Sequence, residues 1–353
     1  MKVIHINSEK SWRGGEQQMA NLILHLTSFG VENYVVCKQN SEMSQFCIKH
    51  SIPFLEVKFS GFKLLDSIKI NKYCNENKID IIHTHSSNAH TAAYYAKILG
   101  CRPSLVVSKR TDFRINSPWK FNSKKVSKVL CVSKKIADIS REQIKNKSKV
   151  VTVYSGINPK RFLVDQESLK LKYKLSNKPL IGNCSALAPH KDYYTFLNVA
   201  KLLPNYNFII MGNGPLENEI KEYAKKLNLS NITFTGFMSD VNKYLKSLDI
   251  FLITSTTEGL GTSILDAMNC EVPVIATKAG GIPEIVKHNE TGLLAEIKDH
   301  DQLAKQCNSI INDDSTRHRI VSQAKQMIDE SFTDIKTATK TFEIYKSILK
   351  TSN

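Results

Sequence analysis

The stretch EGLGTSILDAM (258–268) follows the apolar run DIFLI (249–253) and places two acids, two glycines and two hydroxyl groups within nine residues. This order predicts a buried strand that leads through a glycine-containing loop into a helix. Packing a core requires none of these polar residues. Because the first N–H groups of a helix attract anions, the stretch predicts a site for a small, polar, anionic ligand at a strand–helix junction.

The same alternation of strand and helix extends along the whole chain. Short β-branched runs alternate with amphipathic stretches, which is typical of βα units around parallel sheets. The expected strands form two series, at 2–6, 34–37, 79–83, 104–108, 128–133 and 150–154, then at 179–186, 207–212, 232–236, 249–254 and 273–277. The segment YSGINPKRF (154–162) lies between the series. The sequence therefore predicts an α/β protein with two doubly wound, Rossmann-like domains, residues 1–160 and 161–334.

Length and composition are those of a globular protein with two cores, at 353 residues, 41% hydrophobic and 23% charged. No apolar run approaches the length of a membrane span, and the polar N-terminus lacks the apolar region of a signal peptide. The eight cysteines are scattered without a CxxC pair, so we expect a reduced, cytoplasmic chain. Nearly all of the formal charge of +16 lies in residues 1–165, which suits nucleic acid, an anionic membrane or a phosphorylated substrate.

Glycine-rich loops recur at several expected strand ends. Gly14 and Gly15 in SWRGGEQQ precede the first helix, and MGNGPLENEI places Gly212, Asn213 and Gly214 after another strand. Glycines let the backbone approach a ligand closely, although a plain βα turn is the alternative interpretation. In SALAPHKD, Lys191 stands just past a strand end, where its ammonium group can face a diphosphate.

The acids of the first stretch are the strongest candidates. Glu258 is expected in the loop, and Asp266 about one turn into the helix. Between them, the backbone N–H groups of four residues can hold a diphosphate, namely Leu260, Gly261, Thr262 and Ser263. One acid would bind sugar hydroxyls and the other a ribose diol. Glu258 and Lys191 are the candidate catalytic residues.

The strand exit IDIIHTHSSNAH (79–90) contributes His83 and His85. A His-x-His pair can ligate a metal, but no cysteine or carboxylate stands at ligand spacing, so we expect these residues to contact a sugar or phosphate. The sequence D299-H300-D301 imitates a metal-binding DxD motif, yet Asp299 precedes a helical pattern, where an N-cap is the ordinary interpretation. We therefore expect no metal and no other cofactor.

With these motifs in order, the chain resembles the retaining glycosyltransferases of family 4, the group 1 transferases with the GT-B fold. The resemblance rests on EGLGTSILDAMNCEVPVIATKAGGIPEIVKHNETGLL together with GGEQQ, YSGIN, HKD, GNGP and ITFTGF. It implies two Rossmann-like domains facing across a cleft, with a nucleotide-sugar donor held mainly by the C-terminal domain and a saccharide acceptor held by the N-terminal one. It also implies that the last helix, 335–353, returns to the first domain.

Three positions depart from the family pattern. Asp266 stands where a second Glu is usual, and Ala186 stands where many members carry an Arg. Lys109 and Arg110 occupy the area where many members place a His, so no catalytic histidine is carried over. We expect Arg110, His83 and His85 to bind the acceptor. The residues of the glycine-rich loops are expected to bind the donor, namely Gly14, Gly15, Gly212, Asn213 and Gly214. The resemblance implies retention by a front-face path, in which the leaving phosphate accepts the proton of the acceptor hydroxyl.

Two other functions remain open at this point. A GT-B nucleotide-sugar epimerase would share the fold without an acceptor, and a nucleic-acid-binding protein would account for the basic half, although no nucleic-acid-binding motif is present and we expect no nucleic-acid partner. In the segment 109–128, aromatic residues alternate with lysines and arginines. This pattern favours docking on an anionic membrane face, and hence a lipid-linked saccharide acceptor of a bacterial surface glycan such as lipopolysaccharide. We expect the protein on the inner face of the cytoplasmic membrane.

Overall fold

The computed structural model describes residues 1–59 and 63–352. The chain divides into two compact units. Unit 1 consists of Met1–Gly156 and Asp334–Asn353, and unit 2 consists of Ile157–Thr333. The chain passes from unit 1 to unit 2 after Gly156, within the segment that separates the two series of strands.

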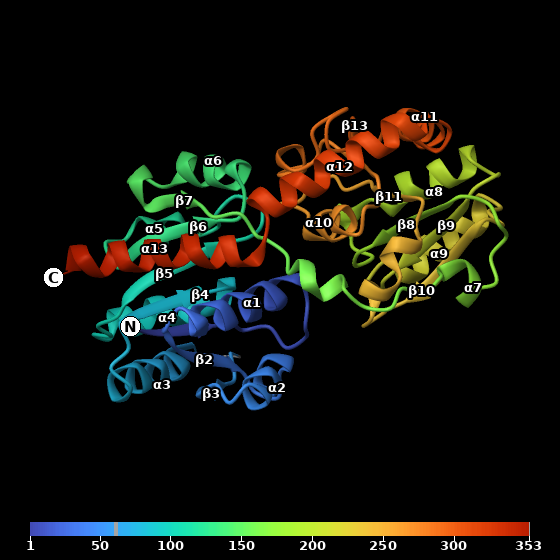
Figure 1. Cartoon of the computed structure of the whole chain (residues 1–353). Helices are drawn as coiled ribbons and strands as arrows, with labels where there is room; N and C mark the ends of the chain where they lie inside the picture. The colour runs from blue at the N-terminus through green and yellow to red at the C-terminus, as the bar shows by residue number, and fades with distance from the viewer. Residues whose placement is uncertain (60–62, 353) are drawn as a thin grey trace. The chain divides into compact units, whose positions relative to one another are not determined.

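Unit 1 is built on a parallel sheet, which among the described residues has seven strands in the order β3-β2-β1-β4-β5-β6-β7 (Figure 1). The strands are β1 (Lys2–Ile6), β2 (Glu32–Lys38), β3 (Phe54–Val57), β4 (Ile81–Thr84), β5 (Ser104–Lys109), β6 (Val126–Cys131) and β7 (Val150–Thr152). The helices of the unit are α1 (Gly14–Ser28), α2 (Glu42–Lys49), α3 (Lys63–Glu76), α4 (Ser87–Ile98), α5 (Pro118–Asn122), α6 (Lys134–Gln143) and α13 (Asp334–Ser352).

The last helix, α13, completes the core of unit 1. It packs beside α1, and its buried residues Ile344, Tyr345 and Ile348 share one apolar cluster with Leu26 and the sheet residue Val106. The hydroxyl group of Tyr345 is also 2.5 Å from Nδ1 of His83 on β4. A helix from the far end of the chain thus covers one face of the N-terminal sheet.

Unit 2 is built on a second parallel sheet, with six strands among the described residues in the order β10-β9-β8-β11-β12-β13. The strands are β8 (Leu180–Cys184), β9 (Asn207–Met211), β10 (Ile232–Gly236), β11 (Ile250–Ile253), β12 (Val274–Thr277) and β13 (Leu293–Ala295). The helices are α7 (Leu169–Lys172), α8 (Tyr193–Leu202), α9 (Glu217–Lys226), α10 (Thr262–Asn269), α11 (His300–Asn312) and α12 (Asp314–Ser331). Two Rossmann-like sheets confirm the predicted fold class.

Two strands are absent from the sequence prediction, β3 and β13. Both lie at an edge of their sheet and are only four and three residues long. Their sequences, FLEV and LLA, contain a single β-branched residue, Val57, so the β-branched runs that marked the other strands are missing here.

The order of strands reverses once in each sheet. In unit 1 the reversal lies between β1 and β4, and in unit 2 between β8 and β11. At such a point the loops that follow the two strands diverge, which opens a crevice at the carboxyl ends where ligands of doubly wound folds bind. In the described residues, no helix has both the length and the apolar character needed to cross a membrane.

The packing of Tyr345 generates the first testable prediction. Tyr345→Ala should lower the free energy of unfolding of the chain by about 3–5 kcal/mol, because it removes a fully buried ring from the core of unit 1. Tyr345→Phe keeps the ring and loses the contact with His83, so the loss should be about 1–3 kcal/mol. Urea denaturation of the three proteins measures the difference. Equal effects of the two substitutions would contradict this assignment of α13 to the core.

Candidate functional site

A cation and a carboxylate meet at the strand reversal of unit 2. Lys191 lies in the short 3₁₀ turn Pro189–Lys191 that follows β8, and Glu258 lies in the loop that follows β11. The Nζ of Lys191 is 2.5 Å from Oε2 of Glu258, and the two side chains are only 14% and 16% exposed. The structure thus brings together the two residues that the sequence predicted to be catalytic.

Backbone contacts hold this pair in place. The hydroxyl group of Thr254, directly after β11, lies 3.1 and 2.9 Å from the carbonyl oxygens of Lys191 and Asp192, which share its one hydrogen. On the other side, Gly281 N donates to the carbonyl oxygen of Glu258 at 2.9 Å. Gly280 has φ of +52°, and a Cβ there would lie 2.0 Å from that same oxygen, so only glycine allows the approach. The glycine-rich exit of β12 therefore supports Glu258.

Helix α10 begins at Thr262, four residues after Glu258, with Gly261 as its N-cap. Thr262 and Ser263 form its first turn and are partly exposed, whereas the side chain of Leu260 is buried and leaves only its backbone for a ligand. The first N–H groups of a helix have no partner within the helix. The start of α10 therefore offers donors for an anion in the same loop as the Lys191–Glu258 pair.

The loop after β9 packs against the loop after β8. Leu187 N donates to the carbonyl oxygen of Asn213 at 3.0 Å, and a Cβ on Gly212, whose φ is +155°, would lie 2.1 Å from the carbonyl oxygen of Ser185. A Cβ on Gly214 would lie 2.5 Å from the carbonyl oxygen of Leu187. These three predicted donor-binding residues are therefore adjacent to the loop that carries Lys191, and their close contacts shape that loop.

Asp266 lies in the second turn of α10 and is partly buried. Desolvation raises the pKa of its carboxyl group from the ordinary value of 3.8 to about 7, and the positive charge of Arg161 opposes the rise. Arg161 belongs to the crossover segment and was not singled out in the sequence. In the sequence, Arg161 is marked only as one of the basic residues in YSGINPKRF. The fold then places its charge near Asp266.

In unit 1, the start of α1 lies next to the end of β1. Gly14 and Gly15 form the first turn of the helix rather than a separate loop. The buried carboxylate of Glu16 accepts hydrogen bonds from the backbone N of Arg13 at 3.0 Å and from Nδ2 of Asn7 at 2.8 Å. This capping arrangement fixes the helix terminus beside the strand reversal of unit 1.

His83 and His85, on and after β4, are both buried. Nε2 of His83 is 2.8 Å from the hydroxyl group of Ser108, and Nδ1 of His85 accepts a hydrogen bond from Nη2 of Arg110 at 3.0 Å. Burial lowers the pKa of both imidazoles well below the ordinary value, so both are neutral at pH 7. Arg110 stays charged, because burial lowers its pKa only to about 10.

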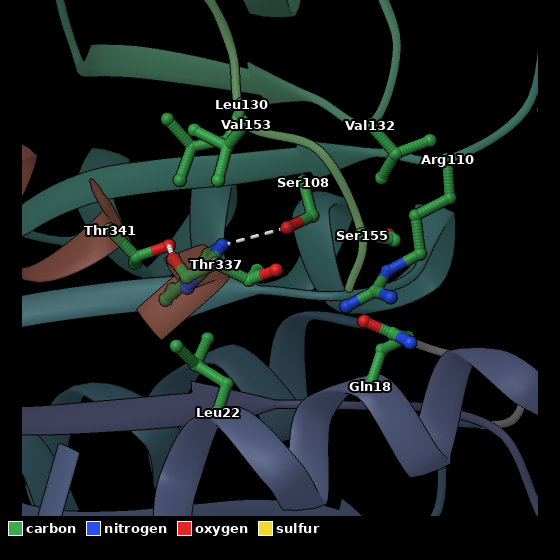
Figure 2. Close-up of a pocket in the computed structure, with 11 residues that line it drawn as sticks. Gln18, Leu22, Ser108, Arg110, Leu130, Val132, Val153, Ser155, Thr337 and Thr341 are labelled. Carbon is green, nitrogen blue, oxygen red and sulfur yellow. Dashed lines mark hydrogen bonds between the residues drawn. The ribbon is translucent and has the colours of Figure 1, made fainter. Parts of the chain in front are cut away.

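A small cavity of about 30 Å³ lies beside His83, Ser108 and Arg110 and is bordered by residues of α1 and α13. Figure 2 shows the side chains of Arg110 and Gln18 pointing toward one another across it, with Ser155 nearby. Thr337 and Thr341 of α13 also line the cavity, together with the aliphatic side chains of Leu22, Leu130, Val132 and Val153. The volume is enough for one or two water molecules, so the cavity is not itself a sugar site.

Asp299 is the N-cap of α11, and its side chain accepts a hydrogen bond from Gln302 N at 2.9 Å. This confirms the N-cap interpretation of the Asp-His-Asp sequence.

Comparison with known families identifies the class of protein. Residues 165–327 match the model for glycosyl transferases group 1, and residues 12–161 match the model for glycosyltransferase family 4. Together the two matches cover most of both units. The chain belongs to the group 1, family 4 glycosyltransferases, and it has the GT-B fold.

Individual relatives are distant but cover most of the chain. The N-acetyl-alpha-D-glucosaminyl L-malate synthase of Bacillus anthracis is 26% identical over 83% of this chain and 81% of its own. The UDP-Gal:alpha-D-GlcNAc-diphosphoundecaprenol alpha-1,3-galactosyltransferase of Escherichia coli is 25% identical over 88% of both chains. The crystal structure of Anabaena HepE in complex with UDP-glucose superposes with a TM-score of 0.87, at 20% identity, over 98% of this chain and 100% of that one.

The raised pKa of Asp266 generates a prediction about stability. The folded state holds this proton more tightly than the unfolded chain between pH 3.8 and about 7, so the carboxyl group destabilises the fold increasingly as pH rises through that window. Asp266→Asn removes this cost and should raise the free energy of unfolding at pH 8 by on the order of 1–3 kcal/mol. Urea denaturation of both proteins at pH 4 and pH 8 measures the effect. A difference that does not grow with pH would contradict the assignment.

Proposed function

We propose that this glycosyltransferase moves a sugar from a nucleotide-sugar donor, with retention of anomeric configuration, onto a lipid-linked saccharide in the synthesis of a bacterial surface glycan. The observation that carries the proposal is the Lys191–Glu258 pair beside the start of α10. At one point of strand reversal, a cation and helix N–H groups can stabilise a departing diphosphate, and a carboxylate can bind the hydroxyl groups of a sugar.

In this proposal, the site residues of unit 2 bind different parts of the donor. Lys191 and the N–H groups of Leu260–Ser263 stabilise the negative charge that builds up on the diphosphate as it leaves the anomeric carbon. Glu258 binds hydroxyl groups of the transferred sugar, and Asp266 binds the ribose diol. Gly212, Asn213 and Gly214 shape the loop beside the nucleotide. Stabilisation of the leaving group is therefore the main catalytic contribution.

Retention follows in this proposal from a front-face path, in which the leaving phosphate takes the proton of the acceptor hydroxyl group. The charge of the leaving group is met by Lys191 and backbone dipoles, so the proposal includes no metal ion and no other cofactor. In unit 1, we propose the first N–H groups of α1, at Gly14 and Gly15, as further donors for an anionic group of the substrate.

The names of the relatives support the class of donor and acceptor. The E. coli relative uses UDP-Gal and a diphosphoundecaprenol-linked saccharide, and the Anabaena structure contains UDP-glucose. We therefore propose a uridine diphosphate sugar as donor. The B. anthracis relative, by its name, joins a sugar to L-malate, so a small soluble acceptor is the competing possibility.

A basic surface with exposed aromatic side chains supports the lipid-linked acceptor. Phe113 and Trp119 are 60% and 56% exposed, and Lys124 and Lys125 are exposed nearby in the sequence. Phe121, which the sequence grouped with them, is instead buried and packs its ring 4.5 Å from that of His90. We propose that this surface docks peripherally on the anionic inner face of the cytoplasmic membrane, where each basic residue contributes about 1 kcal/mol.

Transfer kinetics test the catalytic assignment. Lys191→Ala and Glu258→Ala should each lower kcat/KM by about 10²–10³, because each removes a charged contact in the transition state. The assay uses a panel of UDP-sugars with an undecaprenyl diphosphate-linked saccharide, and activity should survive EDTA. Lys225→Ala is a matched control, since it breaks an exposed Lys–Glu pair of 2.7 Å on α9. Near-normal turnover in Lys191→Ala would remove this residue from the mechanism.

Vesicle co-sedimentation tests the membrane surface. The protein should bind vesicles that contain anionic lipid, and the binding should weaken with salt. The variant Trp119→Ala, Lys124→Ser, Lys125→Ser should lose most of it. The control variant Phe237→Ala, Lys225→Ser, Lys226→Ser removes equally exposed groups from unit 2 and should bind normally. A protein that ignores anionic vesicles at low salt would favour a soluble acceptor.

A further inference from the structure

A buried chain of hydrogen bonds leads from the interior of unit 1 to Arg110. Nη2 of Arg110 is 3.0 Å from Nδ1 of His85, and Nε2 of His85 is 3.0 Å from Nδ1 of His5 on β1. Nε2 of His5 is in turn 3.1 Å from Oδ1 of Asn33 on β2. His5, His85 and Asn33 are 0%, 6% and 7% exposed, so water does not compete for these bonds.

The direction of every bond in this chain is determined from both ends. An arginine can only donate, so Nδ1 of His85 accepts, and a neutral His85 must carry its proton on Nε2. It therefore donates to His5, which must carry its proton on Nε2 and donate to Asn33. At the far end, Nδ2 of Asn33 donates to the carbonyl oxygens of Val31 and Ile23, which leaves Oδ1 as the acceptor. The argument from Arg110 and the argument from Asn33 therefore give the same direction for each hydrogen bond.

The guanidinium group at the end of this chain of hydrogen bonds can donate a further hydrogen bond. Its Nε is buried and has no hydrogen-bond partner among the described residues. Glu16 is the acid whose charge acts on it, but both oxygens of that carboxylate accept hydrogen bonds from Asn7 and Arg13. A partly buried cation that has an unpartnered N–H group, and that forms no direct ion pair among the described residues, is poised to bind an anion.

The same histidines have the spacing of a metal site, since ligand atoms of His5, His83 and His85 lie within 4.8 Å of one another. Both ring nitrogens of each histidine, however, already face a hydrogen-bond partner. The charge of Arg110 also opposes a second cation at His85. The arrangement therefore suits orientation of Arg110 better than metal binding.

We propose that His85 and His5 are positioning residues that fix the guanidinium group of Arg110 for contact with a diphosphate group of a substrate. This replaces the direct contact of His85 with the acceptor that the sequence predicted. It deepens the proposed function and rests on it for the nature of the substrate. The diphosphate belongs either to the nucleotide donor or to a lipid diphosphate acceptor, and the experiment distinguishes the two.

Binding measurements by calorimetry test the positioning role without transfer activity. The probes are UDP, with uridine as the control, and geranyl diphosphate. Arg110→Gln should weaken one diphosphate probe by about 10- to 100-fold and leave uridine unchanged. His85→Leu should have a similar effect, and the double variant should be no worse than Arg110→Gln alone, because both act through one contact. A loss confined to UDP assigns Arg110 to the donor, and a loss confined to geranyl diphosphate assigns it to the acceptor.

His85→Asn is the matched rescue variant, because its Oδ1 can accept from Arg110 at the position of Nδ1. It should bind the affected probe nearly as well as the natural protein. Unchanged affinity of Arg110→Gln for both probes would overturn the proposal. So would additive losses in the double variant, which would mean that His85 acts independently of Arg110.

A measurement on the unaltered protein covers the case in which His85→Leu does not fold. Nitrogen-15 spectra of labelled histidines report which ring nitrogen carries the proton. His5 and His85 should both be neutral Nε2–H tautomers at pH 7. An Nδ1–H tautomer at either residue, or a stoichiometric metal in the purified protein, would overturn the chain of hydrogen bonds. Failure of the proposed transfer reaction would alter none of these readouts.

Discussion

The backbone of Gly280 and Gly281 lies directly against the backbone of Glu258. Gly281 donates to the carbonyl oxygen of Glu258, and a side chain at Gly280 would collide with that oxygen. This contact holds the loop after β11 against the loop after β12. It therefore decides where the carboxylate of Glu258 meets Lys191 and where α10 begins. The charged groups of the site depend on a contact between backbones in which a Cβ has no room.

The two units place different chemistry at equivalent points of the same topology. In unit 2 the strand reversal carries an ion pair and a helix terminus, both partly exposed. In unit 1 the reversal carries histidines whose ring nitrogens are all occupied, and a single arginine is held at the edge of a water-sized cavity. Neutral imidazoles can orient a cation without cancelling its charge, whereas a carboxylate in their place would neutralise it. Arg110 is therefore held by a hydrogen bond to a neutral histidine, and this bond leaves its positive charge in place.

Much of the fold could be predicted from the sequence, because buried parallel strands are short segments rich in β-branched residues. Glu258, Lys191 and the start of α10 could also be predicted, since each stands next to such a run. Arg161 could not, because its relation to Asp266 depends on the path of the crossover. The link from His85 through His5 to Asn33 joins three strand regions that are far apart in sequence, and only the pairing of β1 with β2 and β4 brings them together.

Helix α13 also constrains the order in which the protein can fold during synthesis. Every residue of unit 2 leaves the ribosome before α13 does, yet the core of unit 1 needs Ile344, Tyr345 and Ile348. At about 5–20 residues per second, the sheet of unit 1 waits on the order of ten seconds or more for the helix that covers it. During that time an apolar face that includes Val3, Ile81 and Val106 lacks part of its cover and is a target for chaperones. Unit 2 is continuous in the chain and can complete its own core first.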